Sequence, residues 1–73
     1  MSSIIEFTIN ENQEFIELNK LLKITGVVGT GGEANVRILE GEVKINNTIA
    51  TEKRKKILPK DIVELDGITI HVK

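Results

Sequence analysis

The sequence predicts an α+β fold in which a two-helix hairpin packs on a small, mostly antiparallel sheet of about five strands. Three observations lead to this prediction. Apolar and polar residues alternate near the start of the chain, apolar residues then recur at helical spacing, and short strand-like segments joined by tight-turn sequences follow. A chain of 73 residues with this order of patterns is expected to form one small domain.

Residues 4–9 are predicted to form a half-buried strand, because every second residue is apolar. An Asn-rich break at residues 10–12 follows, and it offers an N-cap for a helix expected over residues 13–25. The apolar residues of this helix recur at helical spacing and are Phe15, Leu18, Leu21 and Leu22. Gly26 is the residue expected to end it.

A second helix is predicted to begin after Thr30, because Thr30 and Glu33 have the spacing of a capping box. Arg37 is expected to point outward and Gly41 to end the helix. The residues expected to face the core are Ala34, Ile38 and Leu39. The two glycines after Thr30 would leave backbone N–H groups exposed at the helix start, which suits an anion.

Two β-hairpins are predicted in the second half of the chain. Asn46-Asn47 would join residues 42–45 to 48–51, and Asp66-Gly67 would join residues 62–65 to 68–72. A turn at Pro59-Lys60-Asp61 lies between them. The predicted core consists of Phe7, Phe15, Leu18, Leu22, Ala34, Ile38, Val43, Ile45, Ile62 and Ile70.

The composition argues against several functions. With no Cys and a single His, neither a disulfide nor a dedicated metal site is expected, and no nucleophile–base pair for an enzyme is apparent. Gly29-Thr30-Gly31-Gly32 lacks the Lys that follows the glycines of a phosphate loop. No cofactor is expected. No apolar run approaches the roughly 20 residues that span a bilayer, so a cytoplasmic location is expected.

Charge is unevenly distributed in this chain of net charge -1. Residues 1–42 hold three cations and seven acids, a net charge of -4, whereas residues 43–73 hold seven cations and four acids, a net charge of +3. Four consecutive cations form what we call the basic loop, Lys53–Lys56. The apolar residues after it, Ile57 and Leu58, indicate that the loop is fixed to the core. Such a fixed cluster suits the backbone of a nucleic acid.

The candidate nucleic-acid contacts are the basic loop (Lys53, Arg54, Lys55 and Lys56), Lys44, Arg37, Lys20 and Lys23. Each has an ordinary alternative. A cationic run is often only a solvated surface, and the two lysines of the first helix suit the negative end of its dipole. Arg37 could pair with Glu33 or Glu40 instead. Base stacking is not expected, since Trp and Tyr are absent and both Phe residues are assigned to the core.

The order of these segments resembles the RNA-binding domain named after small-subunit ribosomal protein four, and especially its small stand-alone bacterial members, the YbcJ-like proteins. The resemblance covers about residue 12 to the end. It divides the single domain 1–73 into an N-terminal strand extension, residues 1–11, and a family-like core, residues 12–73. The segments that carry it are residues 15–23, Gly26, Gly31-Gly32-Glu33-Ala34, residues 41–47, the basic loop and residues 60–63.

The resemblance implies non-catalytic binding of structured RNA by the helix pair and the following hairpin, with ribosomal and transfer RNA as candidate partners. Many family members carry an Arg near the start of the second helix, where this chain has Gly31-Gly32, a pair that the stand-alone members share. Phosphate binding would therefore rest on Lys44 and the basic loop. The alternative is a protein-interaction or ribosome-assembly module whose acidic half binds a basic partner. A monomer is expected, because the outer helix faces are charged.

Overall fold

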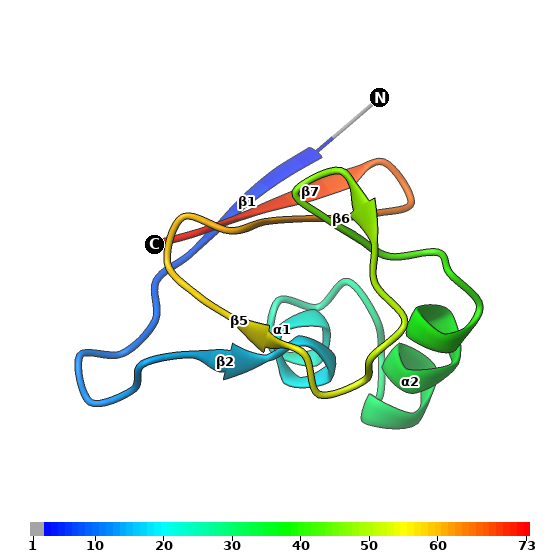
Figure 1. Ribbon diagram of the computed structural model, residues 1–73, viewed down its shortest axis with the longest axis horizontal. Coiled ribbons are helices and arrows are strands. Elements are labelled where there is room, and N and C mark those ends of the chain that lie inside the picture. The colour runs from blue at the N-terminus through cyan, green and yellow to red at the C-terminus, as the bar shows by residue number, and fades with distance from the viewer. Residues whose placement is uncertain (1–2) are drawn as a thin grey trace.

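The computed structural model describes residues 3–73; Met1 and Ser2, which belong to the expected N-terminal extension, lie outside the described part. A five-stranded sheet of order β1-β7-β6-β3-β4 packs against two helices, and a separate two-stranded ladder joins β2 to β5 (Figure 1). The elements are β1 (Ser3–Phe7), β2 (Ile16–Glu17), α1 (Leu18–Ile24), α2 (Gly31–Leu39), β3 (Lys44–Ile45), β4 (Thr48–Ile49), β5 (Lys56–Ile57), β6 (Ile62–Leu65) and β7 (Ile68–Val72). The predicted α+β architecture is confirmed.

The strand pairings explain the mostly antiparallel character of the sheet. Among the sheet strands of residues 3–73, only β1 and β7 run parallel, and the pairs β6–β7, β3–β6 and β3–β4 are antiparallel. Both predicted tight turns are present. Their central residues all have positive φ, namely 50° at Asn46, 68° at Asn47, 51° at Asp66 and 75° at Gly67. These values are those of the hairpin turns whose twist matches that of the flanking strands.

The first helix is shorter than predicted. It begins at Leu18 rather than at residue 13, and the Asn-rich break does not cap it. Residues 16 and 17 instead form β2, in which the buried Ile16 pairs with Ile57 of β5. This pairing joins residues about forty positions apart, so the local apolar period could not reveal it. The end of α1 is as predicted, with Gly26 at φ 79°.

The second helix has the predicted start and end. The Thr30 side chain accepts a hydrogen bond of 3.0 Å from the backbone N–H of Glu33, as in a capping box. Gly41 follows the helix with a φ of 77°. Neither α1 nor α2 has the length and apolar character that a membrane-crossing helix needs.

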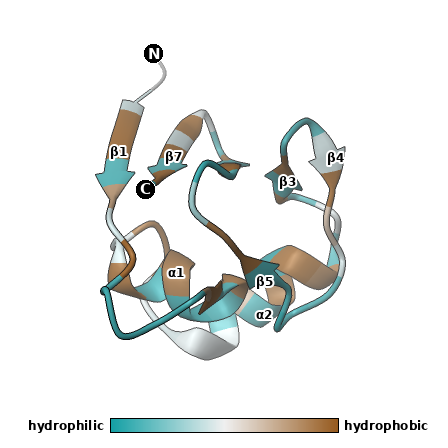
Figure 2. Cartoon of the chain, turned by 60° about the vertical axis from the view of Figure 1, so that its left-hand side comes forward, coloured by the Kyte–Doolittle hydropathy of each residue, from teal (hydrophilic) through white to brown (hydrophobic). Residues whose placement is uncertain are grey.

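The core lies between the helical layer and the sheet, and both layers contribute hydrophobic segments (Figure 2). Seven of the ten predicted core residues are buried: Leu18, Leu22, Ala34, Ile38, Val43, Ile45 and Ile70. Phe7 and Phe15 are only half-buried. Ile62 is 37% exposed, because its neighbour Val63 takes the inward position in β6. Leu39, also expected to face the core, is 58% exposed, since Ala34 and Ile38 occupy the inner face of α2.

Candidate nucleic-acid interface

The basic loop is held by its backbone against the start of α1. The N–H of Leu18 donates to the Lys55 carbonyl at 2.9 Å, and the N–H of Asn19 donates to the Lys53 carbonyl at 3.1 Å. A helix start leaves such N–H groups without partners inside the helix, and α1 has no side-chain cap. The loop therefore caps the helix with main-chain carbonyls, while all four of its residues remain exposed.

The next strand fixes the C-terminal end of the basic loop. Lys56 pairs with Glu17 in the β2–β5 ladder, and Ile57 is fully buried. At the other end, the Lys55 N–H donates to the Glu52 carbonyl at 3.2 Å and closes a turn. The prediction that Ile57 fixes the loop to the core is confirmed, whereas Leu58 stays exposed.

Two of the loop cations have contacts within the chain. The Arg54 Nε lies 3.8 Å from the Glu17 carboxylate, and the Lys56 ammonium lies 4.9 Å from the centroid of the Phe15 ring. In residues 3–73, no carboxylate lies within ion-pair distance of Lys53 or Lys55. In the basic loop, Arg54 and Lys56 therefore have side-chain contacts within the described chain, whereas Lys53 and Lys55 have no acidic partner there.

The two lysines of α1 differ in their surroundings. Lys20 lies 3.5 Å from the same Glu17 carboxylate that Arg54 approaches, which places Lys20 beside the basic loop. Lys23 is exposed in the last turn of α1, where a cation suits the helix dipole. The structure therefore brings Lys20 together with the loop through a shared carboxylate and leaves Lys23 further along the helix.

Lys44 lies on a different face from the basic loop. It is exposed on β3, with Glu64 and Ile49 as its cross-strand partners. Consecutive strand residues face opposite sides, so Lys44 points away from the side occupied by Ile45. Lys55 lines a hollow together with Ile45, whereas Lys44 lines another whose acidic residues are Glu42, Glu64 and Asp66. Lys44 therefore points to one side of β3, whereas the basic loop lies on the other side, next to Ile45.

Arg37 is held by carboxylates of the chain itself. Its Nη1 lies 2.8 Å from Glu42 and 2.9 Å from Asp66, and its Nη2 lies 4.0 Å from Glu33. The hydrogen bond to Glu42 raises the pKa of Arg37 and lowers the pKa of Glu42. Of the two alternative ion pairs that the sequence offers Arg37, the one with Glu33 is present. Within residues 3–73, Arg37 forms no ion pair with Glu40, since Glu42 and Asp66 hold the guanidinium.

A carboxylate also occupies the start of α2, where the sequence suggested a seat for an outside anion. The Glu33 side chain accepts a hydrogen bond of 2.8 Å from the backbone N–H of Gly29. Because Glu33 neutralises part of the positive end of this helix, the Gly31-Gly32 segment is less attractive to a phosphate than a bare helix start.

Sequence reasoning did not identify Glu17 and Phe15 as neighbours of the basic loop. The spacing of Glu17 and Lys20 along a helix could have indicated their pairing. The contact between Phe15 and Lys56 depends on the β2–β5 ladder, for which the sequence offers no local pattern. Across residues 3–73, no three His, Asp or Glu side chains gather in a way that could hold a metal ion.

Comparison with known proteins finds related sequences, among them one from Escherichia coli and one from Bacillus subtilis. YbcJ of Escherichia coli (strain K12) is 37% identical over 57 residues, which cover 78% of this chain and 81% of YbcJ. A Bacillus subtilis (strain 168) protein named "Probable ribosome maturation protein RlbA" is 32% identical over 59 residues, which cover 81% of this chain and 83% of that protein.

The solution structure of E. coli YbcJ has the same fold. It matches this structure with a TM-score of 0.73 at 33% identity, over 99% of this chain and 90% of YbcJ, and it is described as revealing an ALFAL motif involved in RNA-binding. Residues 7–73 match the family described as the S4 domain, the domain that the sequence segments resemble. The chain therefore belongs to the S4 domain family.

Proposed function

We propose that this protein binds structured RNA, without catalysing a reaction on it, and that the basic loop contacts the RNA backbone. The observation that carries the proposal is the backbone fixation of the loop by Leu18, Asn19 and Ile57. Cations on a fixed backbone lose less conformational freedom on binding than cations on a mobile tail. The RNA-binding motif described for YbcJ supports the same partner.

The chemistry of the loop suits phosphates rather than base edges. Arg54 can grip a phosphate through two N–H groups, while each Lys acts as a point charge. Contacts of this kind position an RNA without reading its sequence, so recognition depends on the shape of the folded RNA. Ribosomal and transfer RNA are the candidate partners, and we assign the binding to a cytoplasmic monomer.

The other candidate residues contribute unequally in this proposal. Lys20 extends the cationic surface from the basic loop along α1, and Lys23 continues it by one turn. Arg37 is engaged by three carboxylates and Lys44 lies among acidic residues. We therefore expect changes at Arg37 or Lys44 to weaken RNA binding less than changes in the loop.

The first prediction tests the basic loop directly. Changing Lys53, Arg54, Lys55 and Lys56 together to Gln should leave the thermal melt close to that of the parent, because these side chains lie outside the core. The change should remove most of the RNA affinity. Each lost phosphate contact should reduce the slope of log affinity against log salt by about 0.7 to 0.9. Titration of the protein with a folded RNA at several salt concentrations measures the affinity and the salt slope.

A charge-matched pair of variants separates position from net charge. Lys53→Gln with Lys55→Gln should weaken binding and flatten the salt slope, whereas Lys60→Gln with Lys73→Gln should change both much less. Equal effects from the two pairs would mean that only the total charge matters. If the quadruple variant binds RNA as tightly as the parent, the proposal fails.

A second candidate function is that of a ribosome-assembly accessory that binds a basic protein. The carboxylates of Glu33, Glu42 and Asp66 around Arg37 and the name of the Bacillus relative favour it. If this candidate is right, the variant with all four basic-loop cations changed to Gln should still bind the basic protein. It also predicts that the parent is not retained on immobilised heparin or RNA.

A further inference from the structure

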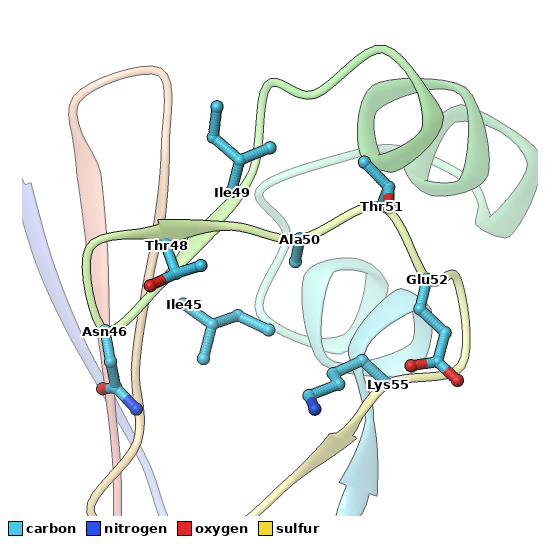
Figure 3. Close-up of a pocket in the computed structure, with 8 residues that line it drawn as sticks. All are labelled: Ile45, Asn46, Thr48, Ile49, Ala50, Thr51, Glu52 and Lys55. Atoms are coloured by element: carbon cyan, nitrogen blue, oxygen red, sulfur yellow. The ribbon is translucent and has the colours of Figure 1, made fainter.

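A hollow of about 430 Å³ lies between the β3–β4 hairpin and the turn that leads into the basic loop (Figure 3). The side chains of Ile45, Thr48 and Ala50 point into it from the hairpin side. The Lys55 side chain extends toward Ile45 from the loop side, and Glu52 lies at the edge of the hollow on that same side, while Ile49 and Thr51 point away. The hollow thus has an apolar wall and a charged wall, and its size lies within the range of about 300–1,000 Å³ that small ligands occupy.

The charged wall carries one acceptor and one donor that do not neutralise each other. The Lys55 N–H bond to the Glu52 carbonyl holds both residues on one turn. In the described part of the chain, the Glu52 carboxylate lies beyond ion-pair distance of Lys55 and of every other cation. Both groups are exposed, so each is available to a ligand that enters the hollow.

We propose that this hollow takes one guanine base extruded from a structured RNA. The Watson–Crick edge of guanine presents the O6 acceptor next to the N1–H and N2–H donors. Lys55 can donate to O6, and the Glu52 carboxylate can accept from N1–H and N2–H together. The face of the base would lie on Ile45 and Ala50, where aliphatic contact takes the place of aromatic stacking.

The other bases fit this pair of groups less well. Adenine, cytosine and uracil each place an acceptor beside their single donor position on this edge, so none can give Glu52 two hydrogen bonds. A base of the wrong kind would leave the Glu52 carboxylate desolvated and unpaired, which is costly. The hollow therefore adds a base preference to backbone contacts that carry none.

This inference rests on the proposed function, because the basic loop must bring the RNA to the hollow. Lys55 belongs both to the basic loop and to the lining of the hollow. Lys53 and Arg54 follow Glu52 directly in the chain. A nucleotide whose base enters the hollow would keep its phosphate beside these cations. The RNA class that fits is a folded RNA with one unpaired guanine that projects from a helix.

The test uses five RNA hairpins that differ at a single position. One has a fully paired stem, and the other four carry one unpaired G, A, C or U in the same stem. At fixed salt, the parent protein should bind the hairpin with the unpaired G about tenfold more tightly than the fully paired stem, as a bidentate base contact provides. The other three unpaired bases should give a smaller gain.

Two variants and a control identify the hollow as the origin of the preference. Glu52→Gln should reduce the ratio of affinities for the unpaired-G and paired hairpins towards one, although removing a negative charge raises both affinities. Glu11→Gln removes an equivalent exposed charge outside the hollow and should keep the ratio. Ala50→Leu fills the hollow and should also lower the ratio, with its thermal melt measured to establish that it folds.

The results separate this inference from the proposed function. If the parent binds all five hairpins equally and Lys53→Gln still flattens the salt slope, the RNA-binding proposal holds and the guanine site is wrong. If Glu52→Gln keeps the full guanine preference, the site is also wrong. If no hairpin binds at all, both proposals fail.

Discussion

Arg37 connects three separate parts of the chain through one guanidinium group. Its partners are Glu33 within α2, Glu42 just before β3, and Asp66 in the β6–β7 turn. The side chain of Arg37 is 31% exposed, so solvent screens these pairs only in part. At the scale of a single residue, a cation predicted to face outward for RNA thus joins the second helix to the sheet.

The pairing of Arg37 and Glu42 predicts a pH-dependent contribution to stability. Arg37 lowers the pKa of Glu42 in the folded state, so folding favours the charged carboxylate. The contribution is complete above the ordinary carboxylate pKa of about 4.3 and is lost as the pH falls through the lowered folded-state pKa. Glu42→Gln should therefore lower the melting temperature near neutral pH and have little effect in strong acid.

Thermal melts of the parent and Glu42→Gln, recorded from neutral to strongly acidic pH, measure this difference. Glu11→Gln serves as the control, because Glu11 is exposed and has no ion-pair partner in residues 3–73. A difference between parent and Glu42→Gln that stays constant over the whole pH range would contradict the prediction.

At the scale of secondary-structure elements, α1 and the basic loop stabilise each other. A helix of seven residues is too short to be stable alone in water. It gains stability from the burial of Leu18, Leu21 and Leu22 and from the two loop carbonyls that accept its first N–H groups. The loop in turn gains a fixed backbone. RNA binding and helix stability should therefore depend on the same buried anchor, Ile57.

Two neighbouring apolar residues test this coupling. Ile57→Ala should destabilise the fold by about 2–4 kcal/mol, because Ile57 is fully buried, and should also weaken RNA binding without changing any charge. Leu58→Ala should have a small effect, since Leu58 is 49% exposed. Denaturant unfolding and hydrogen exchange at the Leu18 and Asn19 amides measure the effect. Equal effects from the two substitutions would show that Ile57 is not the anchor.

The elements that the sequence predicts best depend on neighbouring residues alone. The turns at Asn46-Asn47 and Asp66-Gly67 and the Thr30 cap are determined over three or four positions, and all are present. The β2–β5 ladder joins Ile16 to Ile57, and only the folded chain brings these residues together. For this reason the apolar spacing predicts a start for the first helix that lies five residues before the observed start at Leu18.

In the candidate site, too, the features that depend on neighbouring residues can be predicted, and those that depend on the folded chain cannot. The four adjacent cations and the two apolar residues that follow them are evident from the sequence, but only the structure shows that Ile57 is buried and Leu58 is exposed. The separation of Lys44 from the basic loop depends on the face of the sheet to which Lys44 points. That direction follows from the pairing of Lys44 with Glu64, which exists only in the folded chain. The position of Glu52 across a hollow from Ile45 likewise requires the folded chain.

For the whole molecule, the segregation of charge leads to a prediction about assembly. The N-terminal half is acidic and the C-terminal half basic. The outer faces of the helices carry charges, although Ile24 on α1 and Val36 and Leu39 on α2 are exposed. The other large apolar residues that are exposed belong to other segments and are Ile4, Ile49, Leu58 and Ile62. Because no single element presents a long apolar stripe for a stable interface, we predict a monomer. Light scattering at micromolar concentration should give a mass near 8.1 kDa, and a dimer mass would contradict this.

The parallel pairing of β1 with β7 has a consequence for synthesis of the chain on the ribosome. Ser3 is opposite Ile68, and Phe7 is opposite Val72, so the earliest strand within residues 3–73 pairs with the latest (Figure 1). β1 must wait until residues 68–72 have left the exit tunnel. The α2 helix and the β3–β4 hairpin can form earlier, because their own hydrogen bonds are local, and α1 is completed once the basic loop supplies its two carbonyls. During this delay Ile5 and Phe7 remain uncovered, so completion of the sheet, rather than formation of the helices, sets the moment at which the nascent chain is protected from aggregation.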